Sequence, residues 1–151
     1  MFGIPRMPLA LGLAGLLPFA AGALVATLAD VAPPDTNSPA LLSSDGTAML
    51  VLYGTIILSF MSGVLWGFAT KADGAAATTG YVLSVIPALW AFFARGITPA
   101  ETLSYLIAGF LGLLALDYFF SRQRLTPLWW MPLRILLTSI VVICLAVGPY
   151  A

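Results

Sequence analysis

The chain has 151 residues, the usual size of one domain, so we expect a single domain over residues 1–151. It is 61% hydrophobic and only 8% charged, whereas soluble domains carry about a quarter charged residues, and this composition indicates a protein dissolved in lipid. The charges of the six basic and six acidic residues cancel, which excludes the excess positive charge typical of a nucleic-acid-binding protein. The sequence has no histidine and one cysteine, Cys144, so we expect no metal, haem or other cofactor.

Long apolar stretches separate the charged residues and give the expected architecture. A membrane span needs roughly 20 mostly apolar residues, and it must be helical because lipid offers no hydrogen-bond partners to the backbone. We therefore predict an all-α, polytopic membrane bundle of about five transmembrane helices. In chain order, the predicted helices are 7–29, 47–70, 78–94, 99–120 and 131–149.

The first stretch, 7–29, also resembles a signal peptide, because Arg6 precedes it and Thr27-Leu28-Ala29 closes it. Its apolar run is longer than the roughly 7–15 residues of a signal core. We therefore expect a retained transmembrane helix.

Local residues mark the boundaries of the later helices. Thr98-Pro99-Ala100-Glu101 has the spacing of a capping box with proline at the first helical position. Ser43, Ser44 and Asp45 offer caps for the second helix. Pro87 lies inside the third helix, where we expect it to introduce a kink.

The distribution of basic residues predicts the orientation. Lysine and arginine are enriched in cytoplasmic loops. With the N-terminus cytoplasmic and the C-terminus periplasmic, only Arg95 lies outside. The basic residues that this arrangement places inside are Arg6, Lys71, Arg122, Arg124 and Arg134.

Small residues recur every four positions in three of the predicted helices. Such spacing gives one smooth helix face, which lets another helix approach closely. We favour the interpretation that these faces pack inside the bundle. The alternative is that one of them docks a separate protein. The residues are Ser59, Gly63 and Gly67 in the second helix, Ser104, Ala108 and Gly112 in the fourth, and more loosely Pro18, Gly22 and Ala26 in the first.

Asp117 and Arg134 are the charged pair nearest to the membrane interior. Each lies about one turn inside its helix, and a short loop joins the two helices, so the side chains should lie at similar depth. An unpaired charge in hydrocarbon costs at least a few kcal/mol. We expect an ion pair that fixes the hairpin, and the alternative is a proton or anion site.

Aromatic residues near the helix ends admit two interpretations. Such residues usually lie at the bilayer interface or pack between helices. Tyr53, Trp66 and Pro87, with Tyr81 and Trp90 nearby, could instead line a pocket for a flat apolar ligand such as a quinone or tetrapyrrole.

Catalytic motifs are missing from the sequence. It has no Gly-rich phosphate loop, no metal-binding histidine pair and no G-x-S-x-G motif. Glu101 fits its capping box, and it would lie about 24 Å from Asp117 along one helix at about 1.5 Å per residue. This separation is too large for joint acid–base work, so we expect no enzyme.

Short segments spread over nearly the whole chain carry a resemblance. In order, they are Ile4-Pro5-Arg6, Leu11-Gly12-Leu13-Ala14-Gly15-Leu16-Leu17-Pro18-Phe19, Tyr53-Gly54, Ile57-Leu58-Ser59-Phe60, Gly63-Val64-Leu65-Trp66-Gly67, Ser84-Val85-Ile86-Pro87 and Leu133-Arg134-Ile135-Leu136-Leu137-Thr138. The pattern resembles a family of uncharacterised small membrane proteins that includes mitochondrial transmembrane protein 69. The resemblance implies an inner-membrane address and no known activity. That family has His or Arg immediately before the central Trp, where this chain has Leu65.

Two functional hypotheses follow. The first is a non-catalytic accessory subunit or assembly factor of a larger respiratory or photosynthetic complex in the bacterial inner membrane. Its partners would be the lipid bilayer and other membrane subunits. The alternative is a binding or transport protein for an apolar ligand such as a quinone, lipid or tetrapyrrole.

Overall fold

The computed structural model describes residues 3–28 and 46–147, and every regular element in these two ranges is an α-helix. The helices are α1 (Arg6–Gly15), α2 (Leu17–Leu28), α3 (Gly46–Ala69), α4 (Gly74–Phe93), α5 (Pro99–Arg122) and α6 (Trp130–Val147). With α1 and α2 taken together as Arg6–Leu28, the described residues contain five helical stretches long and apolar enough to span a membrane. The predicted fold class is therefore confirmed. The predicted caps at 43–45 lie outside the described residues.

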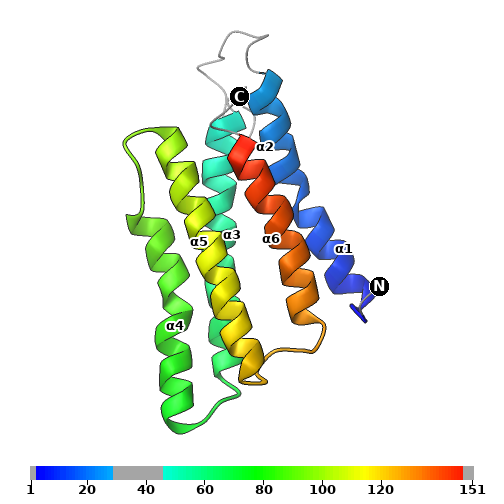
Figure 1. The fold of residues 1–151 in the computed structure, drawn as a ribbon, viewed down its shortest axis with the longest axis vertical. Coiled ribbons are helices and arrows are strands. Elements are labelled where there is room, and N and C mark those ends of the chain that lie inside the picture. Colours follow the sequence, from blue (N-terminus) through cyan, green and yellow to red (C-terminus); the bar gives the residue numbers. More distant parts are fainter. Residues whose placement is uncertain (1–2, 29–45, 148–151) are drawn as a thin grey trace.

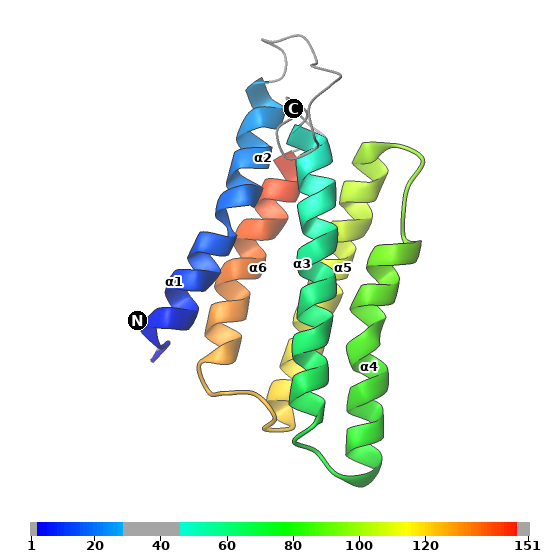
Figure 2. The same ribbon diagram turned by 180° about the vertical axis from the view of Figure 1, so that it is seen from behind.

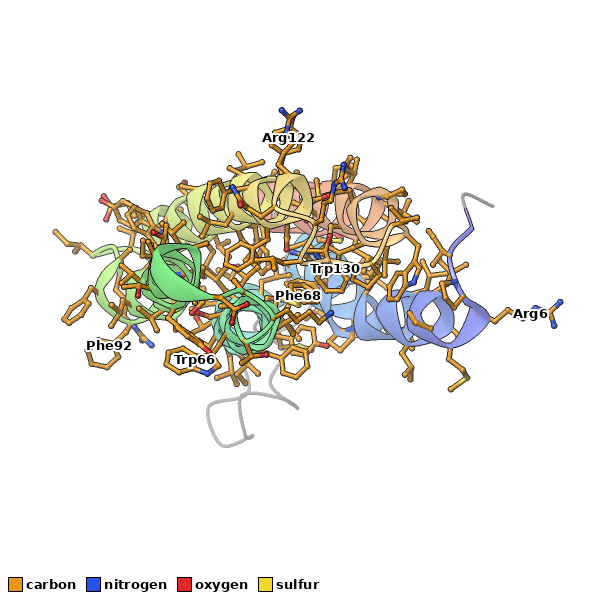
Figure 3. All side chains as sticks on the ribbon, turned by 90° about the horizontal axis from the view of Figure 1, so that it is seen from below. Arg6, Trp66, Phe68, Phe92, Arg122 and Trp130 are labelled. Carbon is orange, nitrogen blue, oxygen red and sulfur yellow. The ribbon has the colours of Figure 1, made fainter. Side chains whose placement is uncertain are left out.

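The helices form two layers, with α3 at the centre of one. Helices α2, α3 and α4 lie side by side, and the α5–α6 hairpin packs across them (Figure 1 and Figure 3). Leu50, Leu58 and Leu65 of α3 are completely buried between the layers. Large apolar side chains also cover the outside, among them Leu17 and Phe92, each 68% exposed. An exterior of this kind is suited to lipid.

The alternating direction of the helices sorts the basic residues to the two ends of the bundle. The start of α1 and the α3–α4 and α5–α6 connections lie toward one end, and the α4–α5 connection lies at the other (Figure 1). Arg95 belongs to the α4–α5 connection, whereas the other five basic residues belong to the first end. The side of the membrane that each end faces stays a prediction.

The first span is broken near its middle, where a continuous helix was predicted. Helix α1 ends at Gly15 and α2 begins at Leu17, so Leu16 separates two helical segments of one span. Pro18 explains the break, because proline has no N–H to bond a carbonyl of the preceding turn and its ring crowds that carbonyl. As a result, α1 leans away from the bundle (Figure 2), and it buries none of its residues.

The other helix bounds differ from the expected ones by a few residues. Helix α4 begins at Gly74 rather than at residue 78, since Ala75, Ala76 and Ala77 are strong helix formers. The capping box at the start of α5 is confirmed: Thr98 Oγ1 accepts from the Glu101 N–H, and the Glu101 carboxylate accepts from the Thr98 N–H.

Pro87 lies inside α4, and a serine of the neighbouring helix supports the backbone around it. The Ser62 hydroxyl of α3 donates to the Ser84 carbonyl and accepts from the Ala88 N–H at 3.3 Å. These two backbone groups are four residues apart and flank the proline, so Ser62 bridges one rung of the α4 hydrogen-bond ladder. Side chains of neighbouring helices commonly satisfy backbone groups beside a transmembrane proline.

Replacing Ser62 with alanine should lower the free energy of unfolding by about 1 kcal/mol, because interhelical hydrogen bonds in membranes contribute on this scale. Equilibrium unfolding in mixed detergent micelles, followed by circular dichroism, measures the change. Ser59→Ala is the control, since the exposed Ser59 hydroxyl donates to the Thr55 carbonyl of its own helix. Equal stability of the two variants would contradict the bridging role.

Candidate functional site

A buried ion pair joins α5 to α6. Arg134 Nε donates to Asp117 Oδ2 at 2.8 Å, and the two side chains are only 6% and 0% exposed. Asp117 lies five residues before the end of α5 and Arg134 lies four residues after the start of α6, on the two arms of one hairpin. The short connection between these helices therefore brings the opposite charges to the same depth, as the sequence predicts.

Trp130 completes this cluster. Its indole Nε1–H donates to Asp117 Oδ1 at 2.9 Å, and its ring lies 5.9 Å from the Arg134 guanidinium carbon. Phe68 of α3 packs edge-on against the indole with ring centres 5.0 Å apart. Figure 3 shows Phe68 and Trp130 pointing between the helices, whereas Arg6 and Arg122 point away from the bundle. Both carboxylate oxygens of Asp117 are thus bonded, and the pair is fixed in orientation.

Two polar atoms beside the ion pair have no hydrogen-bond partner among the described residues. They are Arg134 Nη2 and Thr138 Oγ1, and both residues are buried. Leaving a buried polar group unpaired costs about 1–3 kcal/mol, and more for a charged group. Such atoms therefore need an explanation.

Both side chains line an otherwise apolar cleft of about 330 Å³. Its walls come from α1, α2, α3, α5 and α6, and they include Gly12, Gly15 and the rings of Phe19, Phe60 and Phe110. A volume of this size lies at the lower end of the range found for small-molecule sites.

Trp130 and Thr138 were not predicted to belong to this site. The sequence features described above do not single out Trp130, and Thr138 stands among them only in the segment that carries the family resemblance. A signal was present, because Trp130, Arg134 and Thr138 are four residues apart and residues at this spacing share a helix face.

The pocket around Tyr53, Trp66 and Pro87 stays a prediction, and in the structure these three residues make separate contacts. The Tyr53 hydroxyl donates to the Gly15 carbonyl at 2.9 Å, and its ring packs on Phe19. Trp66 packs against Tyr81 with the two rings tilted, and it is 49% exposed on the outside of the bundle (Figure 3). Pro87 is buried beside α5. Among the clefts described for residues 3–28 and 46–147, Pro87 lines the hollow between α4 and α5, whereas Tyr53 and Trp66 pack against neighbouring rings.

The two regular small-residue faces point outward, where internal packing was the favoured interpretation. All six residues are exposed: Ser59, Gly63 and Gly67 on α3, and Ser104, Ala108 and Gly112 on α5. A side chain added at Gly63, Gly67 or Gly112 would meet nothing within 4 Å. Ala108 and Gly112 also line a hollow of about 310 Å³ between α4 and α5. Within the described part of the chain, both faces therefore have open space beside their glycines.

The looser face on the first span packs internally. Gly22 and Ala26 of α2 are buried against the start of α3. A Cβ at Gly46 would lie 2.2 Å from the Ala26 backbone nitrogen and 2.3 Å from the Gly22 carbonyl oxygen. Small residues therefore set the close crossing of α2 and α3.

Comparison with known proteins places these features in a family. Residues 4–149 match the family described as "Protein of unknown function (DUF3429)". The chain is also 33% identical over 147 residues to transmembrane protein 69 of the frog Xenopus tropicalis, and the match covers 93% of this chain. It covers 53% of the frog protein, so the chain spans about half the length of this relative. No solved structure matches the chain.

Proposed function

Since this chain belongs to the DUF3429 family, a family of unknown function, we propose its role from its own geometry: a non-catalytic accessory subunit or assembly factor of a larger membrane complex. It is a multi-pass membrane protein with five membrane-length helical stretches in its described part. The partner complex would be of the respiratory or photosynthetic kind in an energy-converting membrane.

One observation carries the proposal, namely the outward small-residue faces of α3 and α5. Lipid tails are as apolar as leucine, so burial of apolar surface does not drive helices together within a membrane. Helices in a membrane associate where their backbones pack closely, and glycine permits this close approach. Open space beside Gly63, Gly67 and Gly112 therefore supports docking of helices from another protein.

The two carboxylates of α5 support a non-catalytic role. Asp117 is held by Arg134 and Trp130, and Glu101 accepts hydrogen bonds from the backbone N–H groups of Ile97 and Thr98. Each carboxylate thus has a structural task, and the two lie toward opposite ends of α5.

The grouping of the basic residues supports the proposed orientation. Five of the six lie toward the end of the bundle where α1 begins, and the positive-inside rule assigns that end to the cytoplasm. We place the protein in the bacterial inner membrane with the N-terminus cytoplasmic and the C-terminus periplasmic.

The test is purification of the tagged protein from its native membrane in a gentle detergent. We expect the wild type to elute as a particle larger than its 15.9 kDa mass requires, with a partner in fixed stoichiometry. Gly63→Leu and Gly112→Leu should each weaken this association by at least tenfold, because the new side chains hold the partner helix away.

Ala21→Leu is the matched control, since it adds bulk at an exposed position on α2, outside both small-residue faces. It should keep the partner. Melting curves of the purified variants separate loss of docking from loss of folding. A wild-type protein that is always monomeric, or a partner retained by both glycine variants, would overturn the proposal.

A further inference from the structure

We propose that the cleft beside Arg134 binds an uncharged, lipid-soluble molecule through a carbonyl oxygen, with Arg134 Nη2 and Thr138 Oγ1 as the recognising atoms. The isoprenoid quinones and the acylglycerols both have this chemistry. This site goes beyond the docking role proposed above and depends on different residues.

The cleft runs from the lipid-facing surface into the core. Leu11 of α1 and Phe60 of α3 line it and are each 65% exposed. Phe19 and Phe110 line it too, and each is only 1% exposed. An apolar molecule can therefore enter sideways from the bilayer between α1 and α3, with its polar head toward the interior and its tail in lipid.

The break at Leu16 provides this entrance. Helix α1 leans away from α3 (Figure 2) and buries no residue of its own, so the space beside it is not closed by helix packing. Gly12 and Gly15 of α1 line the cleft without side chains that would fill it.

Two buried polar atoms meet the apolar walls at the inner part of the cleft. Arg134 is held by its Nε on Asp117, which leaves Nη2, a fixed N–H donor, without a partner among the described residues. Thr138 lies one turn further along the same face of α6, and its hydroxyl is likewise unpartnered there. A carbonyl oxygen between them accepts from both groups and satisfies them.

The charge of the site favours an uncharged ligand. Asp117 already neutralises Arg134 at 2.8 Å. A carboxylate or phosphate would therefore bring an additional negative charge into an apolar surrounding with no cation left to balance it. A ketone or ester oxygen accepts the same hydrogen bonds without that penalty.

The experiment is a ligand titration of the full chain in detergent, followed by native mass spectrometry, which counts bound molecules. The probes are decylubiquinone for the ring carbonyl, dioctanoylglycerol for the ester carbonyl and oleate for the anion. We expect saturable 1:1 binding of decylubiquinone or dioctanoylglycerol, and the better of the two identifies the source. Tighter binding of oleate than of both would overturn the choice of an uncharged ligand.

Two variants locate the binding. Thr138→Val keeps the shape of the side chain without its hydroxyl, and we expect about a tenfold weaker affinity. Gly15→Leu, at a position whose Cβ would have only the Tyr53 hydroxyl nearby at 3.9 Å, should fill the cleft and abolish saturable binding. Gly63→Leu is the control, and it should lose the docking partner but keep the ligand. No saturable binding to the wild type, or binding unchanged in both cleft variants, would overturn the proposal.

Discussion

Replacing Asp117 with alanine is expected to lower the free energy of unfolding by about 3–5 kcal/mol, the largest effect of any single change considered for this bundle. The variant leaves the Arg134 guanidinium buried without its counter-charge and removes the acceptor of the Trp130 indole N–H. Equilibrium unfolding in mixed detergent micelles measures the loss. The effect is large because neither the packed helices nor the lipid can solvate the remaining charge.

A double variant tests whether the charge pairing is the cause. Asp117→Leu combined with Arg134→Met removes both charges and keeps most of the side-chain volume, so we expect most of the lost stability to return. Asp117→Asn should lie between the single alanine variant and the wild type, because it keeps an oxygen for Trp130 without the charge. If the double variant proves as unstable as Asp117→Ala, packing rather than charge pairing explains the role of Asp117.

Helix number and approximate helix position could be predicted from the sequence because they depend on local physics. A span must be long enough to cross about 30 Å of hydrocarbon and must satisfy its own backbone, so length and composition decide where spans lie. The capping box at Thr98 and Glu101 is equally local, since it depends on residues three apart. The hairpin between α5 and α6 is short enough to predict that Asp117 and Arg134 would meet.

Which helix face points inward could not be predicted in the same way. In water an apolar stripe marks the buried face, but in lipid both faces are apolar. Leu58 in the core and Phe60 on the surface are two residues apart on α3. The small-residue pattern is ambiguous for the same reason. The same spacing is buried at Gly22 of α2 and exposed at Gly63 of α3, and only the packed arrangement distinguishes them.

The cleft depends on tertiary structure that residue spacing does not encode. The common face of Trp130, Arg134 and Thr138 was readable from the sequence, but the space in front of it requires the break after Gly15 and the resulting tilt of α1. Pro18 was interpreted only as part of a small-residue face, although its missing N–H is what interrupts the span.

Replacing Gly46 with alanine is expected to lower the free energy of unfolding by about 1–3 kcal/mol, although alanine is the better helix former by about 1 kcal/mol. The added Cβ would lie 2.2 Å from the Ala26 nitrogen and 2.3 Å from the Gly22 carbonyl oxygen. These are backbone atoms, so no rotamer change relieves the overlap, and α2 must move away from α3. Unfolding in mixed micelles measures the loss.

Gly63→Ala is the matched control for this prediction, since it makes the same substitution in the same helix where nothing lies within 4 Å. It should leave stability unchanged or raise it by up to about 1 kcal/mol through helix propensity alone. The difference between the two variants therefore isolates the contact between α2 and α3. Equal stability of Gly46→Ala and Gly63→Ala would mean that these helices cross at a greater distance, and that the buried small residues of α2 do not set their packing.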